Sequence, residues 1–416
     1  MNKTIKLAVA SALLAAASGA NAGIMIPAGD WTLDIGGIVN AYYTSTRTSG
    51  DGVGLAGAND TGTRTASNIT TGLLPNYLSV SGKTRQNDLD VGFTISIQPG
   101  ASTTSAGQQG GTVGGVSNQE NRQAFLTFGD KSWGSIKLGK DLGIYASDAI
   151  LNDMTLLGVG SGAGFLAGNT TTLGRIGTGF MYADWKSQVA YSSPNWNGFS
   201  FTAGVTQAWD ATAALLNNPA KTNAFSSATS AGRGGSSPAF EAKASYEWAG
   251  DVGGKVWASA MTQKVDNLFS ITGVDLGGDR ATAWDLGATV NVAGFGLTGY
   301  YGQGSGSGTT IQLRDGFDNA GKSRDSKDYY VQGTYTIPTV GTKLGLSYGK
   351  SKLEGNGAGD TGLANSDYSN KMWTLGAYHP ITKHLNLVAE YDDVKTKIGS
   401  ADGKSKTIAL GAILFF

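Results

Sequence analysis

The chain has 416 residues, carries 31 basic and 31 acidic side chains, and contains no cysteine. Charges so evenly balanced exclude bulk attraction to nucleic acid or to an anionic membrane surface, and the lack of cysteine excludes a disulfide scaffold and any cysteine-based metal or redox site. The hydrophobic content is 40%, and no run beyond the N-terminal region approaches the length of a transmembrane helix.

The first 22 residues are predicted to be a cleaved signal peptide. Lys3 and Lys6 form a charged region, Leu7 to Ala17 is apolar, and Ala20-Asn21-Ala22 is a small-x-small cleavage site. The alternative is a membrane anchor, but the apolar run is too short to span ~30 Å of hydrocarbon and no stop-transfer pattern follows. We therefore expect one mature domain, residues 23–416, with a net charge of 29 − 31 = −2 once Lys3 and Lys6 are removed.

From residue 31 onward the chain consists mainly of segments of about ten residues in which apolar and polar side chains alternate, the pattern of a β-strand with one apolar face. In the segment 89–98, for example, Leu89, Phe93 and Ile97 share one face, and polar residues occupy the other. Sixteen such segments are predicted, at residues 31–46, 77–86, 89–98, 120–130, 134–141, 185–193, 199–206, 240–248, 253–266, 283–292, 295–303, 327–338, 341–351, 370–381, 384–397 and 405–416.

The predicted strands are joined by two kinds of connection that strictly alternate. Short turns are expected at 130–133, 194–197, 250–252, 338–340 and 382–383. Long loops rich in Gly, Ser, Thr and Asn are expected near 47–76, 99–119, 142–184, 209–237, 267–281, 304–326 and 352–369. This arrangement is typical of an up-and-down antiparallel barrel with one rim in the periplasm and the other facing outside.

The distribution of charge between the two strand faces separates a membrane barrel from a soluble sandwich or propeller. A soluble fold would carry charges on its outer face, whereas here one face is almost purely Leu, Val, Ile, Phe and Ala, with aromatic residues near the strand ends. Because a bilayer offers no water to satisfy a free sheet edge, the strands must close on themselves. The sequence therefore predicts an all-β transmembrane barrel of about sixteen strands with a water-filled lumen.

Three stretches of the chain carry further motifs. The last strand, Lys404 to Phe416, ends on an aromatic residue that is preceded by an alternating apolar row, Leu414, Ala412, Leu410 and Ile408. The segment Glu120 to Lys140 resembles the hairpin before the constriction loop of Gram-negative general porins, and Gln188 to Phe199 resembles the hairpin after it. The resemblance covers essentially the whole mature chain and points to the betaproteobacterial and neisserial branch of that family.

The resemblance implies a homotrimer of sixteen-stranded barrels in the outer membrane, each with the segment 142–184 folded into its lumen. It implies that Phe416, Leu414, Leu410 and Ile408 form a signal read by the barrel assembly machinery. It also implies that acidic residues of the loop, here Asp148 and Asp153, face a basic cluster on the opposite wall. The loop lacks the acidic, glycine-flanked motif of the enterobacterial relatives. The implied partners are small hydrophilic solutes and ions, outer-membrane lipid and lipopolysaccharide.

Strand alternation places Lys83, Arg85, Lys137 and Lys186 on the lumen face, and these four are the candidate basic wall of the pore constriction. Arg122 shares its face with apolar residues, so we expect it outside the pore, at a subunit contact. The alternative for each lumen charge is that it is merely solvated. A unit charge ~8 Å from a passing ion contributes about 0.5 kcal/mol in water, so four would bias entry by roughly 2 kcal/mol before screening. A weak anion preference is the expectation.

Several motifs point to chemistry that their context does not support. Gly316 to Ser323 matches the phosphate-binding pattern G-x-x-x-x-G-K-[ST], but it lies in a polar loop and a strand, not a helix, is predicted after it. His379 and His384 flank a predicted turn, which disfavours a serine hydrolase or a metal site. Gly359 to Asp367 is acidic but lacks the ligand spacing of a calcium loop. We expect no enzyme activity, no cofactor and no metal.

Two classes of function remain after these exclusions. The first is a passive diffusion pore, and the second is a barrel used as an adhesin, receptor or substrate-selective channel. A selective sugar channel would carry a track of aromatic residues in its lumen, but the lumen face is mostly Gly, Ser, Thr and Asn, with Tyr42 and Tyr330 as exceptions. The sequence therefore favours a general diffusion pore.

Overall fold

The computed structural model describes residues 23–57, 62–102, 112–113, 116–117, 119–163, 171–211, 236–266, 268, 274–318, 320–356 and 367–416. The predicted signal peptide, residues 1–22, and most of the acidic segment Gly359 to Asp367 lie outside the described residues.

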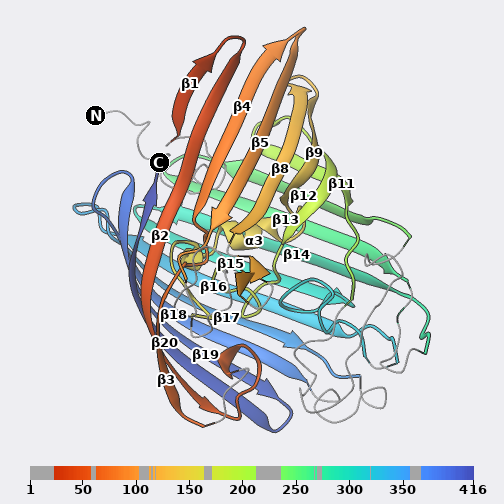
Figure 1. Ribbon diagram of the computed structural model, residues 1–416, viewed down its shortest axis with the longest axis vertical. Helices are drawn as coiled ribbons and strands as arrows, with labels where there is room; N and C mark the ends of the chain where they lie inside the picture. The colour runs from red at the N-terminus through yellow and green to blue at the C-terminus, as the bar shows by residue number, and fades with distance from the viewer. Residues whose placement is uncertain are drawn as a thin grey trace.

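Sixteen antiparallel strands form one closed sheet, in which each strand pairs with the next along the chain. They are β2 (Trp31–Gly50), β4 (Tyr77–Gln86), β5 (Leu89–Pro99), β8 (Gln119–Asp130), β9 (Gly134–Leu142), β10 (Trp185–Ser192), β11 (Phe199–Thr206), β12 (Ala239–Trp248), β13 (Val252–Val265), β14 (Asp279–Val292), β15 (Phe295–Ser305), β16 (Asp325–Thr336), β17 (Lys343–Leu353), β18 (Tyr368–Pro380), β19 (Leu385–Ile398) and β20 (Ala401–Phe415). The pairing of β20 with β2 closes the barrel (Figure 1). The predicted fold class is confirmed, and each predicted segment overlaps one of these strands.

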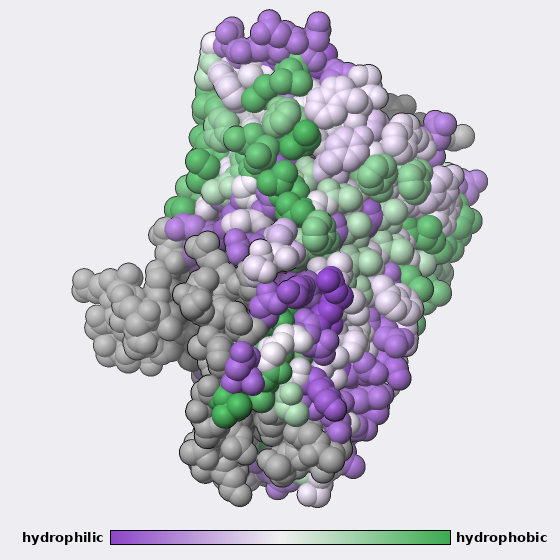
Figure 2. All heavy atoms as spheres, turned by 90° about the vertical axis from the view of Figure 1, so that its right-hand side faces the viewer, coloured by the Kyte–Doolittle hydropathy of each residue, from purple (hydrophilic) through white to green (hydrophobic). Residues whose placement is uncertain are grey.

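Side-chain exposure alternates along the strands as the sequence pattern predicts. On β14, Trp284 and Leu286 are 42% and 50% exposed on the outer face, whereas Asp285 between them is 1% exposed and faces the lumen. Figure 2 shows apolar side chains spread over one side of the barrel, with hydrophilic residues toward its upper and lower ends. Exposed apolar residues outside and polar residues inside reverse the usual order of a soluble protein, so this surface suits a bilayer.

Tight turns join the strands at one rim and mostly long loops at the other. The β4–β5 turn is formed by Asn87 and Asp88, whose φ angles of 49° and 61° belong to the left-handed pair that a two-residue hairpin favours. The predicted strict alternation of short and long connections is wrong at the last hairpin. There β19 and β20 are joined at the loop rim by Gly399 and Ser400 alone, because Gly399 adopts a φ of 57° without a Cβ penalty.

The structure contains short elements that alternation did not predict. They are β1 (Ile24–Ala28), β3 (Arg64–Thr70), β6 (Thr112–Val113), β7 (Val116–Ser117), the helices α2 (Gly54–Gly57) and α3 (Ser147–Leu151), and the 3₁₀-helix η2 (Met154–Leu157). β1 and β3 pair with the two ends of β2, and β6 pairs with β7. Within the described ranges, no helix combines the length and the apolar character that crossing a membrane requires.

The two ends of the described chain meet along one edge of β2. Phe416 exchanges two backbone hydrogen bonds with Gly37, at 2.8 and 3.0 Å. Immediately beyond, β1 pairs with β2 from Ile24 opposite Ile35 to Ala28 opposite Trp31. β1 therefore extends the line of β20 and covers the part of β2 that β20 does not reach.

Candidate functional site

The connection between β9 and β10 turns into the lumen instead of projecting from the rim. We call residues 143–184 the inward loop; its residues 143–163 and 171–184 are described. The two strands pair up to Leu142 opposite Trp185, and Gly143 N–H then donates to the Asp184 carbonyl at 2.7 Å. Inside the barrel, Phe180 packs edge-on against the lumen-facing rings of Tyr300 and Tyr330, with centroid separations of 6.4 and 5.8 Å. Burial of these aromatic surfaces against one another stabilises the inward position of the loop.

Glu241 on β12 holds the start of the inward loop. One carboxylate oxygen accepts hydrogen bonds from the backbone N–H groups of Ile144 and Tyr145, at 2.8 and 2.9 Å. The other oxygen forms an ion pair with Lys186, which also donates to Gln312. Both charged side chains are fully buried. Lys186 is therefore on the predicted lumen side of its strand, but it is a buried structural cation and not part of an exposed wall.

Asp148 on α3 pairs with two lysines outside the predicted basic wall. Its carboxylate lies 2.6 Å from the Lys255 ammonium on β13 and 3.2 Å from Lys243 on β12. Burial raises the pKa of Asp148, but the two ammonium groups outweigh that effect and hold the pKa below its ordinary value. The acid is only 3% exposed, so the expectation that it faces a basic cluster across an open pore is corrected to a direct ion pair with the adjacent wall.

Asp153 is likewise buried, where it begins η2. Its side chain accepts the Thr155 N–H at 3.2 Å and lies 3.6 Å from the Arg175 guanidinium, a cation within the same loop. Burial raises the pKa of Asp153 despite the opposing effect of Arg175. Arg175 in turn donates to the Met372 carbonyl and to Thr374 on β18, both at 3.3 Å. Asp153 thus organises the loop and does not face the lumen.

A second glutamate, Glu390 on β19, anchors the inward loop farther along. One of its oxygens accepts the N–H groups of Val159 and Gly160, at 2.7 and 3.1 Å. The other accepts the hydroxyl of Tyr378 at 2.6 Å. On β2, the Tyr42 hydroxyl donates to the Leu157 carbonyl at 2.6 Å. The loop is therefore tied to β2, β12, β13, β18 and β19, which fixes it across the lumen.

The lumen faces of β4, β5, β8 and β9 lie away from these anchors, and we call them the open wall. Lys83 on β4 is exposed and shares its face with Ser81, which hydrogen-bonds Thr94 of β5 at 2.9 Å. Lys137 on β9 forms an ion pair with Asp141 and lies 4.8 Å from the centre of the Phe125 ring. The open wall thus combines small polar side chains with two of the predicted basic residues.

Arg85 lies near the β4–β5 turn, where acidic groups surround it. Its guanidinium is 2.8 Å from both Asp90 and Asp130. The four predicted basic residues therefore do not gather in one cluster: two line the open wall, one is paired at the rim, and one is buried. Alternation places each of the four on the lumen side of its strand. By the same rule Lys243 faces the lumen, since it lies two residues from Glu241 on β12 and shares its face.

Other predicted residues lie on the outer surface. Arg122 is buried on the outer side of β8, where it pairs with Glu120 at 2.7 Å and lies 5.8 Å from the Trp185 ring. Ile408, Leu410 and Leu414 of the proposed assembly signal are exposed on the outer face of β20, which ends beside Phe416.

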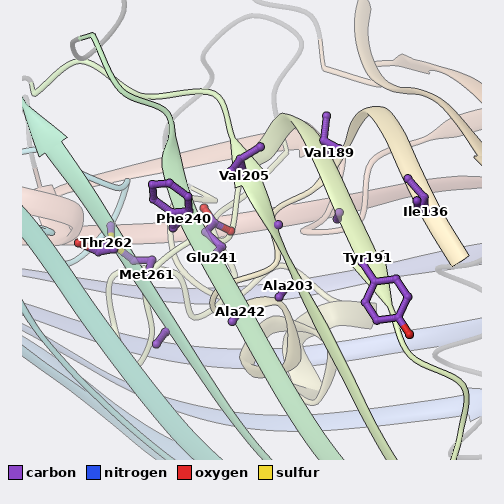
Figure 3. Close-up of a pocket in the computed structure, with 13 residues that line it drawn as sticks. Ile136, Val189, Tyr191, Ala203, Val205, Phe240, Glu241, Ala242, Met261 and Thr262 are labelled. Carbon is purple, nitrogen blue, oxygen red and sulfur yellow. The ribbon is translucent and has the colours of Figure 1, made fainter. Parts of the chain in front are cut away.

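Figure 3 shows a hollow on the outer side of the barrel, lined by apolar residues such as Val189, Val205 and Phe240 of β10 to β12. It faces the lipid and not the pore.

The motifs that were not expected to bind phosphate or metal or to act in catalysis lie in a loop, at a strand end and in a turn. Gly316 to Ser323 belongs to the loop between β15 and β16 and leads directly into β16, not into a helix. His379 is near the end of β18, where a ring nitrogen is 2.8 Å from the Thr342 hydroxyl, and His384 lies in the adjoining turn.

Comparisons with known proteins agree with this architecture. The sequence profile of the Gram-negative porins matches residues 8–399. No curated protein sequence matches significantly. The anion-selective porin from Comamonas acidovorans has a TM-score of 0.60 at 16% identity, covering 93% of this chain and 100% of that one. The outer membrane channel DcaP of Acinetobacter baumannii has 0.59 at 15%, covering 95% and 100%. The trimer form of OmpT from Vibrio cholerae has 0.51 at 13%, covering 93% and 99%. These structural likenesses concern the fold.

Proposed function

The chain belongs to the family of Gram-negative porins, and on this premise we propose a general pore for small hydrophilic solutes and ions with a weak preference for anions. As a member of that family it is a diffusion channel of the outer membrane and not an enzyme. One observation carries the proposed selectivity. The two acids predicted to line the constriction, Asp148 and Asp153, are buried and paired with cations, whereas Lys83 on the open wall is exposed.

The expected preference is small because few charges act on the passing ion. Arg85 and Lys137 both have carboxylate partners within ion-pair distance, so Lys83 dominates among the predicted basic residues. A single charge ~8 Å from an ion contributes about 0.5 kcal/mol in water, which corresponds to roughly a twofold bias toward anions. The anion selectivity named for the Comamonas porin, a protein of similar fold, supports the proposed sign.

The test is the reversal potential of the purified full chain in a planar bilayer across a KCl gradient. The wild-type protein should conduct with a mild anion preference, and Lys83→Glu should remove or invert it without closing the pore. Lys131→Glu, which changes an exposed lysine in a turn at the periplasmic rim, serves as the matched control and should leave the reversal potential unchanged. Cation preference in the wild type would refute the selectivity, and a folded barrel that does not conduct would refute the pore.

Trimeric assembly is part of the proposal. The family resemblance implies it, and the trimer form of Vibrio cholerae OmpT supports it by likeness of fold. Arg122, buried on the outer face of β8 and paired with Glu120, is the residue that we place at the subunit contact. Conductance that rises in groups of three equal steps would support the trimer, and single independent steps throughout would contradict it.

We also propose how the protein reaches its membrane. The signal peptide, residues 1–22, is removed, and Phe416, Leu414, Leu410 and Ile408 are read by the barrel assembly machinery. The start of β1 at Ile24 supports cleavage before Gly23, since the mature chain would then begin with the short strand that extends the line of β20. The intact mass of the purified protein checks the cleavage site. Lipopolysaccharide is proposed as the surrounding lipid partner.

A further inference from the structure

Four lysines form a straight row across the outer faces of the last four strands, and we call Lys350, Lys371, Lys395 and Lys404 the lysine row. Each member stands directly opposite the next in the sheet register, one on each of β17, β18, β19 and β20 (Figure 1, blue strands). The neighbouring residues along these strands, such as Ser351, Met372 and Val394, are buried toward the lumen. By alternation the four lysines therefore point away from the lumen.

Direct opposition of like charges is unfavourable in an antiparallel sheet, because opposing side chains are only about 5 Å apart. Among the described residues, no carboxylate lies within ion-pair distance of Lys350, Lys371 or Lys395. Lys404 pairs with Asp402 of its own strand at 3.3 Å. A lysine next to the row does have such partners, since Lys352 forms ion pairs with Glu354 and Asp367. Three of the four lysines thus have no ion-pair partner among the described residues. The nearest acids on this face act at longer range or on other lysines: Asp367 attracts Lys350 electrostatically, and Asp393 lies 3.9 Å from Lys406.

The height of the row places it at a membrane surface. Tyr348 and Trp373 pack against each other on the outer face, with ring centroids 4.7 Å apart, and each lies two residues from a member of the row. Outward-facing aromatic rings of this kind mark the interface between hydrocarbon and headgroups. The row lies beyond them on the side of the long loops, so it faces the headgroup layer of the outer leaflet.

We propose that the lysine row binds the phosphate groups of lipopolysaccharide, the phosphorylated glycolipid of that leaflet. Phosphate oxygens accept short charge-assisted hydrogen bonds from ammonium groups, and one phosphate between two lysines replaces their repulsion by attraction. With strands about 4.8 Å apart, the row spans roughly 14 Å, which suits two phosphates carried on one headgroup. The inference deepens the lipid partner named above and rests on the proposed orientation of the porin in the outer membrane.

The test compares the full-length wild type with Lys371→Gln/Lys395→Gln, the two central members of the row. Lipopolysaccharide retained after extraction from outer membranes is quantified per porin, and binding is then measured on protein refolded in detergent without it. We expect the variant to bind at least about tenfold less, since two charged hydrogen-bond donors are lost. Lys131→Gln/Lys383→Gln, two exposed lysines at the opposite rim, is the matched control and should bind as the wild type does.

Further arms identify the ligand and separate the two proposals. Lys371→Arg/Lys395→Arg should retain binding, whereas enzymatically dephosphorylated lipopolysaccharide and equimolar inorganic phosphate should bind weakly to the wild type. Equal binding by the glutamine variant, or undiminished binding of the dephosphorylated lipid, would overturn the lipid site. Conductance is recorded on the same preparations. Loss of lipid binding by the glutamine variant with normal conductance supports the lipid site. Absence of conductance in the wild type contradicts the proposed pore and leaves the result on lipid binding unaffected.

Discussion

The carboxylate of Glu241 is predicted to control whether the inward loop stays docked. Glu241→Gln removes the charge that compensates the fully buried Lys186, and it replaces an acceptor of the loop's backbone N–H groups by a weaker, neutral amide. Breaking a buried ion pair by removing one partner costs about 3–5 kcal/mol. If this cost falls on the docked state of the loop, the population of undocked loop rises by a factor between roughly 150 and several thousand.

The absence of cysteine from the chain makes this shift measurable. Ser147→Cys is nearly isosteric and places a thiol on α3, where the native side chain is 3% exposed. Its rate of labelling by a membrane-impermeant thiol reagent reports how often the loop opens, and that rate should rise by the factor above when Glu241→Gln is added. Glu354→Gln, a change in an ion-paired glutamate at the loop rim, is the control and should leave the rate unchanged.

A second substitution distinguishes the ion pair from a general loss of packing. Adding Lys186→Met removes the uncompensated charge, so the triple variant should label more slowly than Ser147→Cys with Glu241→Gln alone. A labelling rate for Glu241→Gln within a factor of a few of the starting rate would contradict this role of the carboxylate. Simple additivity of the effects of Glu241→Gln and Lys186→Met would contradict it too, because the two groups would then not interact.

Three further outcomes are expected. Asp148→Asn leaves Lys243 and Lys255 without their loop carboxylate, so the reversal potential should move toward stronger anion preference; an unchanged value would contradict the ion pairs. The pKa of Asp148 is lowered in the folded protein, so its ionised form stabilises docking above the ordinary value of 3.8, and this stabilisation is lost as the pH falls through the lower folded value. Protonation of Asp148 weakens docking, and an undocking loop produces fluctuations of the open-channel current. These current fluctuations should therefore be constant from about pH 7 to pH 5 and increase only below about pH 4. Deletion of Phe416 leaves the N–H and carbonyl of Gly37 without their partners, so less barrel should resist unfolding in SDS at room temperature; an unchanged folded fraction on gels would argue against this role.

The strands and their faces could be predicted because both depend on local pattern. A strand in a barrel between lipid and water must alternate at every residue, so each segment reveals its own outer face. This is why Ile408, Leu410 and Leu414 lie outside and Lys83 lies inside as the alternation requires. β1 and β3 were missed because they are short and lack a regular apolar row.

The charge partners could not be predicted, because alternation assigns a face but neither the height of a residue on the wall nor its position around the barrel. Lys186 and Lys243 both face inward, yet the path of the inward loop buries the first against Glu241 and brings the second to Asp148. The same holds for the lysine row, whose members are far apart in sequence and are aligned by strand register.

The sequence by itself determined the barrel, its strand count and its lipid-facing surface, since each follows from a period of two residues repeated along the chain. Only the tertiary structure decided which charges meet, because a carboxylate and an ammonium interact over a few ångströms in space. Those distances are set by how the strands are staggered and by where the inward loop comes to rest.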